Sequence, residues 1–209
     1  MTSLITSRNS RTKFLLIVVS ITMACTGKRD VDPKALEYVS KATQAVVSPG
    51  RREVQYPKAI LYLDSAIAKD KTCKVAYSNK IRLLSTLKRY REALVVSDQL
   101  IVVSENAPYA TLHKAIVLKK LKDPAANGYF EKALHQYNKA LEEISSDQKD
   151  LTDQYLLHKS YCLYFLEGRK ASIDQLGILK RRLSDDSHID YLIGKISYMP
   201  EEQFLKDLF

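Results

Sequence analysis

Apolar residues recur at intervals of three and four positions from Asp32 to the C-terminus, the spacing of one face of a helix. We find no convincing strand-like alternation in this part of the chain. Breaks fall at turn residues, and Asp32-Pro33 combines an acidic N-cap with a proline at the first helical position. The pattern predicts helices over residues 33–47, 56–69, 73–87, 90–104, 108–121, 129–146, 150–166, 169–183, 187–197 and 200–208. Because the connections are short, neighbouring helices should run antiparallel in an all-α fold.

Three short segments of this helical region are similar to one another: Tyr56-Pro57-Lys58-Ala59-Ile60, Tyr90-Arg91-Glu92-Ala93-Leu94 and Phe130-Glu131-Lys132-Ala133-Leu134. The first two are 34 residues apart, and the third follows after 34 residues plus a six-residue insertion, which we place at 122–128. Small residues recur further along the outer two copies, at Ala66 and Ala140, whereas the middle copy has Leu100 there. A repeat of this length indicates stacked supersecondary units.

This pattern resembles the tetratricopeptide repeat (TPR), in which an aromatic residue closes the turn between two helices and small residues allow the helices to approach closely. The resemblance implies an all-α, right-handed superhelical array of antiparallel helix pairs over residues 33–209. It covers 54–145 best, with a terminal cap at 187–209. An unrelated helix bundle is the alternative. The implied packing residues are Tyr56, Ala59, Ala66, Tyr77, Tyr90, Ala93, Phe130, Ala133, Tyr137 and Ala140.

In TPR proteins the first helix of each pair lines a concave face, where partners bind as extended peptides or helices. The positions that match this face here are Val75, Ser78, Asn79, Arg82, Tyr109, Leu112, His113, Ile116 and Lys119. They form a mixed groove in which apolar anchors are flanked by Arg82 and Lys119. We expect a protein or peptide partner with apolar side chains and some acidic ones. Asn79 alone does not make the family's carboxylate clamp.

The N-terminus has the features of a secretory signal. Three basic residues precede the apolar run Phe14–Ala24, which is too short to span a bilayer. Ala24-Cys25 resembles the lipobox of bacterial lipoproteins, although Thr22 stands where that family usually has Leu. The resemblance implies a signal peptide at 1–24, lipid attachment at Cys25 and a short tether at 25–32. An uncleaved anchor and a cytoplasmic N-terminus remain alternatives.

Residues near Cys25 bear on localisation. Thr26 is not the Asp that retains enterobacterial lipoproteins in the inner membrane, and Lys28-Arg29 replaces the acidic run of many surface-displayed lipoproteins. We therefore expect an outer-membrane lipoprotein that faces the periplasm. The chain has 33 basic and 24 acidic residues, and it stays basic without its leader. Both signs are interspersed and no aromatic–basic stacking motif occurs, so we expect no nucleic acid partner.

Candidate chemistry is sparse. His158 and Cys162 are four residues apart on one helix face, but two ligands do not make a zinc site, and Cys162 is better explained as a core residue. A disulfide between Cys73 and Cys162, in different repeat units, is geometrically unfavourable. We find no phosphate-binding Gly loop and no nucleophile elbow. We therefore expect no metal, no cofactor and no enzymatic activity.

The sequence thus favours an envelope lipoprotein that acts as a protein-binding adaptor or scaffold. One alternative is an immunity lipoprotein that neutralises a toxin or effector. A further alternative is an envelope enzyme or glycan-binding protein with an unrecognised site. The partner's identity and the oligomeric state are left open.

Overall fold

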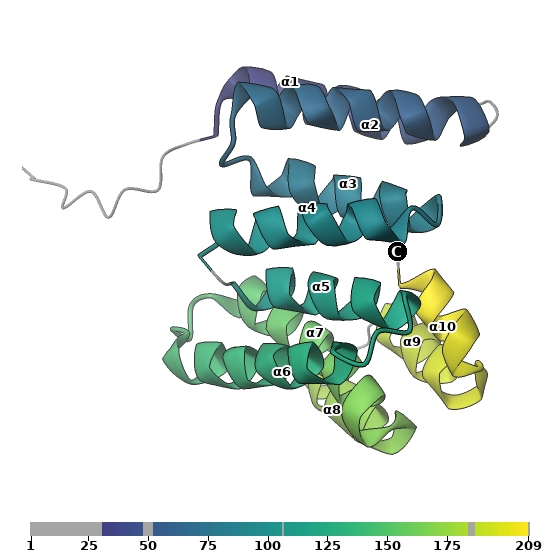
Figure 1. Cartoon of the computed structure of the whole chain (residues 1–209). Coiled ribbons are helices and arrows are strands. Elements are labelled where there is room, and N and C mark those ends of the chain that lie inside the picture. Colours follow the sequence, from purple (N-terminus) through teal and green to yellow (C-terminus); the bar gives the residue numbers. More distant parts are fainter. Residues whose placement is uncertain (1–30, 48–51, 106, 184–186, 209) are drawn as a thin grey trace, which may run out of the picture. The chain divides into compact units, whose positions relative to one another are not determined.

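The computed structural model describes residues 31–47, 52–105, 107–183 and 187–208. These residues form α-helices and connecting turns, without a strand (Figure 1). The helices are α1 (Pro33–Val47), α2 (Arg52–Lys69), α3 (Lys74–Thr86), α4 (Tyr90–Val103), α5 (Pro108–Lys120), α6 (Ala126–Glu143), α7 (Lys149–Glu167), α8 (Arg169–Arg182), α9 (Ser187–Tyr198) and α10 (Glu201–Asp207).

The predicted all-α fold is confirmed. Two helices begin about one turn earlier than the sequence predicts, α2 at Arg52 and α6 at Ala126. Proline is usually found in the first turn of a helix. In the structure Pro57 lies inside α2, and Tyr56 is therefore a helical residue rather than the residue that closes a turn.

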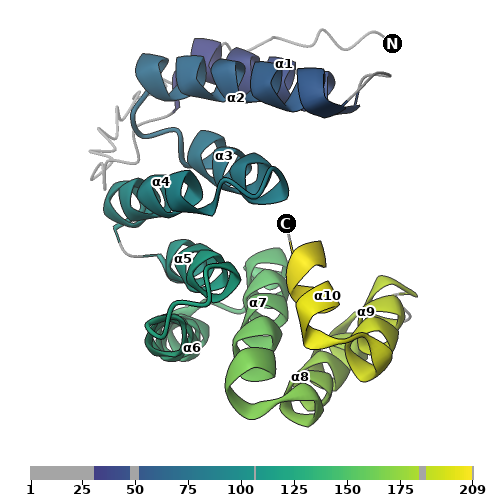
Figure 2. The same cartoon turned by 45° about the vertical axis from the view of Figure 1, so that its right-hand side comes forward.

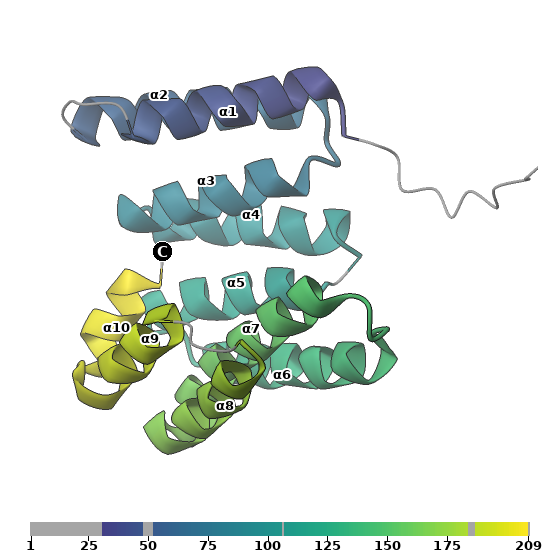
Figure 3. The same ribbon diagram turned by 180° about the vertical axis from the view of Figure 1, so that it is seen from behind.

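The helices pack as consecutive pairs in a TPR-like array. The pairs are α1–α2, α3–α4, α5–α6 and α7–α8, and α9 continues along α8. Figure 3 shows the pairs one after another along the described domain. Contacts between successive pairs include α3 with α5 and α5 with α7, all first helices of their pairs. These helices share one side of the array, which we call the inner face.

Most of the predicted packing residues are buried at the helix crossings. Ala59, Ala66, Ala93 and Ala133 have no exposed surface, and Phe130, Tyr137 and Tyr77 are buried with them. Tyr56, Tyr90 and Ala140 are only half-buried. Small side chains let the two helices of a pair approach, and the large rings fill the adjoining space.

A recurring turn geometry supports the 34-residue period. Lys88 and Lys122, 34 residues apart, follow α3 and α5 and have φ of 60° and 57°. In both turns the next backbone N–H reaches back to a carbonyl five residues earlier, from Arg89 to Leu84 and from Asp123 to Leu118. This is the Schellman arrangement, which satisfies the last carbonyls of a helix.

A recurring ion pair has the same period. Lys80 of α3 binds Asp64 of α2, and Lys114 of α5 binds Asp98 of α4, both with a nitrogen–oxygen distance of 2.5 Å. Each lysine is mostly buried, and each pair links the second helix of one unit to the first helix of the next. The repeat therefore includes turn geometry and charge as well as small residues.

The predicted signal peptide at 1–24 and the lipid-attachment residue Cys25 lie outside the described residues. Within the part of the chain that the structure describes, no helix is both long enough and apolar enough to cross a membrane.

Candidate partner-binding face

The residues predicted to bind a partner fall into two groups on the inner face. On α3, Val75 and Arg82 are exposed, and Ser78 and Asn79 are half-buried. On α5, Leu112 and Ile116 are 2% exposed and thus belong to the core. Both still line a cavity of the inner face that is described below, and their role as apolar anchors for a partner stays a prediction.

Lys119 also differs from its predicted role. Its ammonium lies 3.1 Å from the carboxylate of Glu201 on α10 and 5.5 Å from the centre of the Phe165 ring on α7. The sequence pattern assigned Lys119 to an open groove, because it could not show that the C-terminal helix returns to the inner face. Lys119 therefore already has an intramolecular partner.

An open groove lies between α1 and α3, and we call it the α1–α3 groove. It has a volume of about 250 Å³. Asn79 and Arg82 of α3 contribute an amide and a guanidinium to its lining, and four of the other lining residues are apolar. Its lining residues are Ala42, Thr43, Val46, Leu63, Asn79, Arg82, Leu83 and Thr86. The groove thus combines an apolar floor with an amide and a guanidinium, which suits a peptide segment with an acidic residue.

A second cavity, the α5–α7 pocket, adjoins the first through Arg82. It has a volume of about 340 Å³ and is lined by Arg82, Leu112, His113, Ile116, His158, Tyr161 and Leu208. Leu208 follows α10, so the C-terminal segment forms part of the wall. Arg82 borders both cavities and makes no salt bridge within the described residues.

The two histidines of the α5–α7 pocket are neutral at pH 7. Burial lowers the pKa of His113 to about 3, with the nearby His158 and Arg82 as further causes. Burial also lowers the pKa of His158 to about 4, and its Nδ1 lies 3.0 Å from the Tyr137 hydroxyl. Arg82 is therefore the permanent positive charge of the pocket lining.

The two cysteines among the described residues do not line this pocket and do not have the properties of activated nucleophiles. Cys162 is fully buried, and desolvation raises the pKa of its thiol to about 12, which keeps it protonated and unreactive. Cys73 is also buried, and both cysteines are free. Among the described residues, no group of three or more His, Cys, Asp or Glu side chains is arranged to hold a metal ion.

The sequence pattern missed the contribution of α10 to this face. Figure 2 shows α10 beside α7 and close to α9. Phe204 of α10 is buried against Tyr164, Tyr161 and Phe165 of α7, with ring centroids 4.5, 6.2 and 6.2 Å from its own. The three-residue spacing of Glu201, Phe204 and Asp207 is a signal of one helix face, but it does not show what that face contacts.

No family model matches the sequence, and no curated protein matches it. Solved structures similar to the domain include MamA 41-end from Desulfovibrio magneticus RS-1, at 15% identity and a TM-score of 0.48, covering 80% of this chain and 86% of that one. Another is YrrB, a TPR protein with an unusual peptide-binding site, at 18% identity and a TM-score of 0.42, covering 83% and 81%. The TPR-like assignment rests on the helix pairs and their 34-residue period.

Proposed function

We propose that this chain is a protein-binding adaptor of the bacterial envelope, with a lipid anchor at Cys25 and a TPR-like domain that binds a protein segment on its inner face. The observation that carries the proposal is the α1–α3 groove, where Asn79 and Arg82 stand beside an apolar floor. The partner is a peptide or helix with apolar side chains and an acidic residue that reaches Arg82.

The binding residues of this proposal lie on α3, because the predicted residues of α5 are buried or already paired. Leu112 and Ile116 are buried and Lys119 is paired with Glu201, so the predicted positions on α5 offer little to an incoming chain. Arg82 is exposed, Asn79 is half-buried, and both line the groove. A bidentate contact between Arg82 and a carboxylate would fix the orientation of the partner, and the apolar floor would supply desolvation energy.

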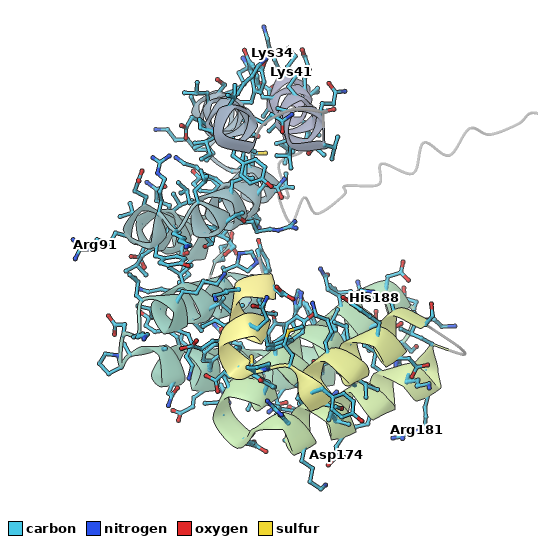
Figure 4. All side chains as sticks on the ribbon, turned by 90° about the vertical axis from the view of Figure 1, so that its right-hand side faces the viewer. Lys34, Lys41, Arg91, Asp174, Arg181 and His188 are labelled. Carbon is cyan, nitrogen blue, oxygen red and sulfur yellow. The ribbon has the colours of Figure 1, made fainter. Side chains whose placement is uncertain are left out.

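Affinity capture of the acylated full chain from membranes tests this function. Arg82→Glu should abolish capture of the partner, because it places a negative charge where an acidic side chain binds. The matched control is Arg91→Glu on α4, since Arg91 points outward from α4 (Figure 4). Equal capture by both variants, with unchanged helical circular dichroism, would show that the groove does not bind the partner. Capture of one toxin-like effector as the sole partner would instead identify an immunity protein.

The anchor is a separate part of the proposal and needs its own experiment. Labelling with radioactive palmitate should mark the wild-type chain, and Cys25→Ser should lose the label, because the thiol is the acylation site in the lipoprotein family. Fractionation of the envelope then tests the outer-membrane location. Equal label in the Cys25→Ser variant would refute lipid attachment at this residue.

A further inference from the structure

We propose that α10 occupies a binding site on the inner face of its own domain and can be displaced from it. This site, which we call the seat, binds a partner helix that has an aromatic residue three positions after an acidic one. The seat comprises the rings of Tyr161, Tyr164 and Phe165 on α7 and the ammonium of Lys119 on α5. This inference rests on the proposed function as a protein-binding domain and names the chemistry of a second binding position on the same face.

Phe204 is the fully buried anchor of α10, and Leu205 and Leu208 pack against the same apolar cluster as partly buried residues. Phe204 is 2% exposed and is the one buried residue among the described side chains of α10. Its ring is tilted by 53° against Tyr164 and makes edge contact with Tyr161. Aromatic rings in such arrangements dominate the energy of many interfaces. The contact between α10 and α7 therefore has the form of a helix docked by one anchor residue.

Charge complementarity reinforces this anchor. Glu201 pairs with Lys119 of α5, and Asp207 pairs with Lys195 of α9 at 2.6 Å. The helix thus presents acidic residues on either side of Phe204 to basic residues of two different helices. A partner of the same pattern, acidic and aromatic at three-residue spacing, would meet the same rings and ammonium groups.

The described features of α10 also make it displaceable. It has seven residues, and a helix of this length is unstable without tertiary contacts. Glu201 is 53% exposed, and exposed ion pairs contribute little. The segment thus has one fully buried ring, two partly buried leucines and two ion pairs to hold it in place. Short elements with so few buried contacts open more readily than the core of a domain.

Peptide binding to the full chain tests the proposal. The probe is a fluorescently labelled peptide of residues 199–208, followed by fluorescence anisotropy. The wild-type chain should bind it weakly because α10 fills the seat. Phe204→Ala in the chain should tighten binding at least about ten-fold, because loss of the anchor vacates the seat. The same peptide carrying Phe204→Ala should bind neither chain. Tyr198→Ala is the control, since Tyr198 is 88% exposed, and it should behave as wild type.

Two further variants test the proposal if Phe204→Ala unfolds, as a weaker helical circular dichroism signal would show. Glu201→Gln in the chain releases α10 from Lys119 and leaves Lys119 for the peptide, so affinity should rise about three-fold. Lys119→Gln releases α10 equally but removes the peptide's own ion-pair partner, so the rise should be smaller. Equal affinities of both variants and wild type would contradict the proposal.

The outcomes separate this inference from the proposed function. If the peptide binds the wild-type chain and the folded Phe204→Ala chain with equal affinity, α10 is not a displaceable occupant. Binding of the peptide that carries Phe204→Ala would overturn the proposal as well. If membrane capture still depends on Arg82, the adaptor function stands while the α10 seat fails. If capture does not depend on Arg82 and peptide affinity does not depend on Phe204, both proposals are overturned.

Discussion

At the residue scale, the array depends on the smallest side chains that a helix interior accepts readily. Ala59, Ala93 and Ala133 are completely buried where paired helices cross, and each is followed or flanked by large apolar side chains. A larger residue at such a crossing pushes the helices apart, and an interior at crystal-like density cannot absorb the extra volume without strain.

Replacement of a crossing alanine should therefore cost more than replacement of a surface alanine in the same helix. Ala59→Leu should lower the free energy of unfolding by about 1–3 kcal/mol, because three extra carbon atoms enter a filled contact. Ala68→Leu is the matched control, since Ala68 is an exposed residue of α2. Urea unfolding measures both, and equal stability of the two variants would contradict tight packing at Ala59.

The buried histidines give a pH dependence with a defined sign. The pKa of His158 is lowered to about 4 and that of His113 to about 3, so the unfolded chain, with ordinary histidine pKa values, binds more protons between about pH 4 and 6.5. Their contribution to stability should thus fall as pH drops below about 6.5 and level off near the folded-state values. At pH 5 each buried histidine should cost roughly 2 kcal/mol relative to pH 7.

The variant His158→Gln isolates this effect. It should flatten the loss of unfolding free energy between pH 7 and pH 5, measured by urea unfolding at each pH, because the unfolded state of the variant gains one proton fewer. His135→Gln, which removes an exposed histidine of α6, should keep the wild-type slope. Identical slopes in all three proteins would show that His158 is accessible to protons in the folded state.

At the element scale, three non-glycine residues that follow helices, Lys88, Glu105 and Lys122, have a costly backbone conformation with positive φ, and two of them repeat after 34 residues. Lys88 and Lys122 have φ near +60°, where a side chain clashes with the backbone and glycine does not. Both residues follow a helix and close its end through Schellman hydrogen bonds. The positive φ is thus a consequence of the hydrogen bonds at the helix end, and the lysine side chain does not favour it.

Glycine at either turn should therefore stabilise the domain. Lys88→Gly is expected to raise the free energy of unfolding by about 1 kcal/mol, because relief of strain exceeds the extra freedom of the unfolded chain. Lys139→Gly, at an exposed position inside α6, should instead lower it by about 1 kcal/mol. Thermal or urea unfolding checks the opposite signs, and a loss of stability in Lys88→Gly would contradict the strain argument.

Local patterns predicted the helices well and the site only in part. Helix starts and ends follow from apolar spacing and from turn residues such as Asn106-Ala107-Pro108, and the crossing alanines follow from the repeat. The turns at Lys88 and Lys122 carry no glycine, so their left-handed geometry had no compositional signal. The burial of Leu112 and the pairing of Lys119 depend on α7 and α10, which are distant in sequence, and local spacing does not encode such contacts.

At the scale of the whole described domain, three apolar clusters take the place of one central core. One joins α1, α2 and the start of α3 around Leu63, a second is centred on α3–α4, and a third extends from α5 to α10. Each helix pair packs mainly on its neighbours in the chain. Arrays of this kind open in parts, because the stability of each unit and of each interface contributes separately.

A cavity in the first cluster should therefore remain a local defect. Leu63→Ala should destabilise α1 and α2 by about 2–5 kcal/mol and accelerate amide hydrogen exchange there, while exchange in α6–α8 stays near wild type. Leu61→Ala, at an exposed position of the same helix, is the control. Uniformly faster exchange along the domain in Leu63→Ala would indicate a single cooperative unit instead.

The matching turns at Lys88 and Lys122 also make the domain extensible. A tandem duplication of residues 89–122 would join Lys122 to Arg89, a junction that reproduces the existing Lys88–Arg89 step in both residue type and backbone geometry. The inserted α4–α5 segment would bring its own ion pair between Asp98 and Lys114. The domain could thus be lengthened by one 34-residue unit at a time, because each new junction would repeat one that the chain already contains.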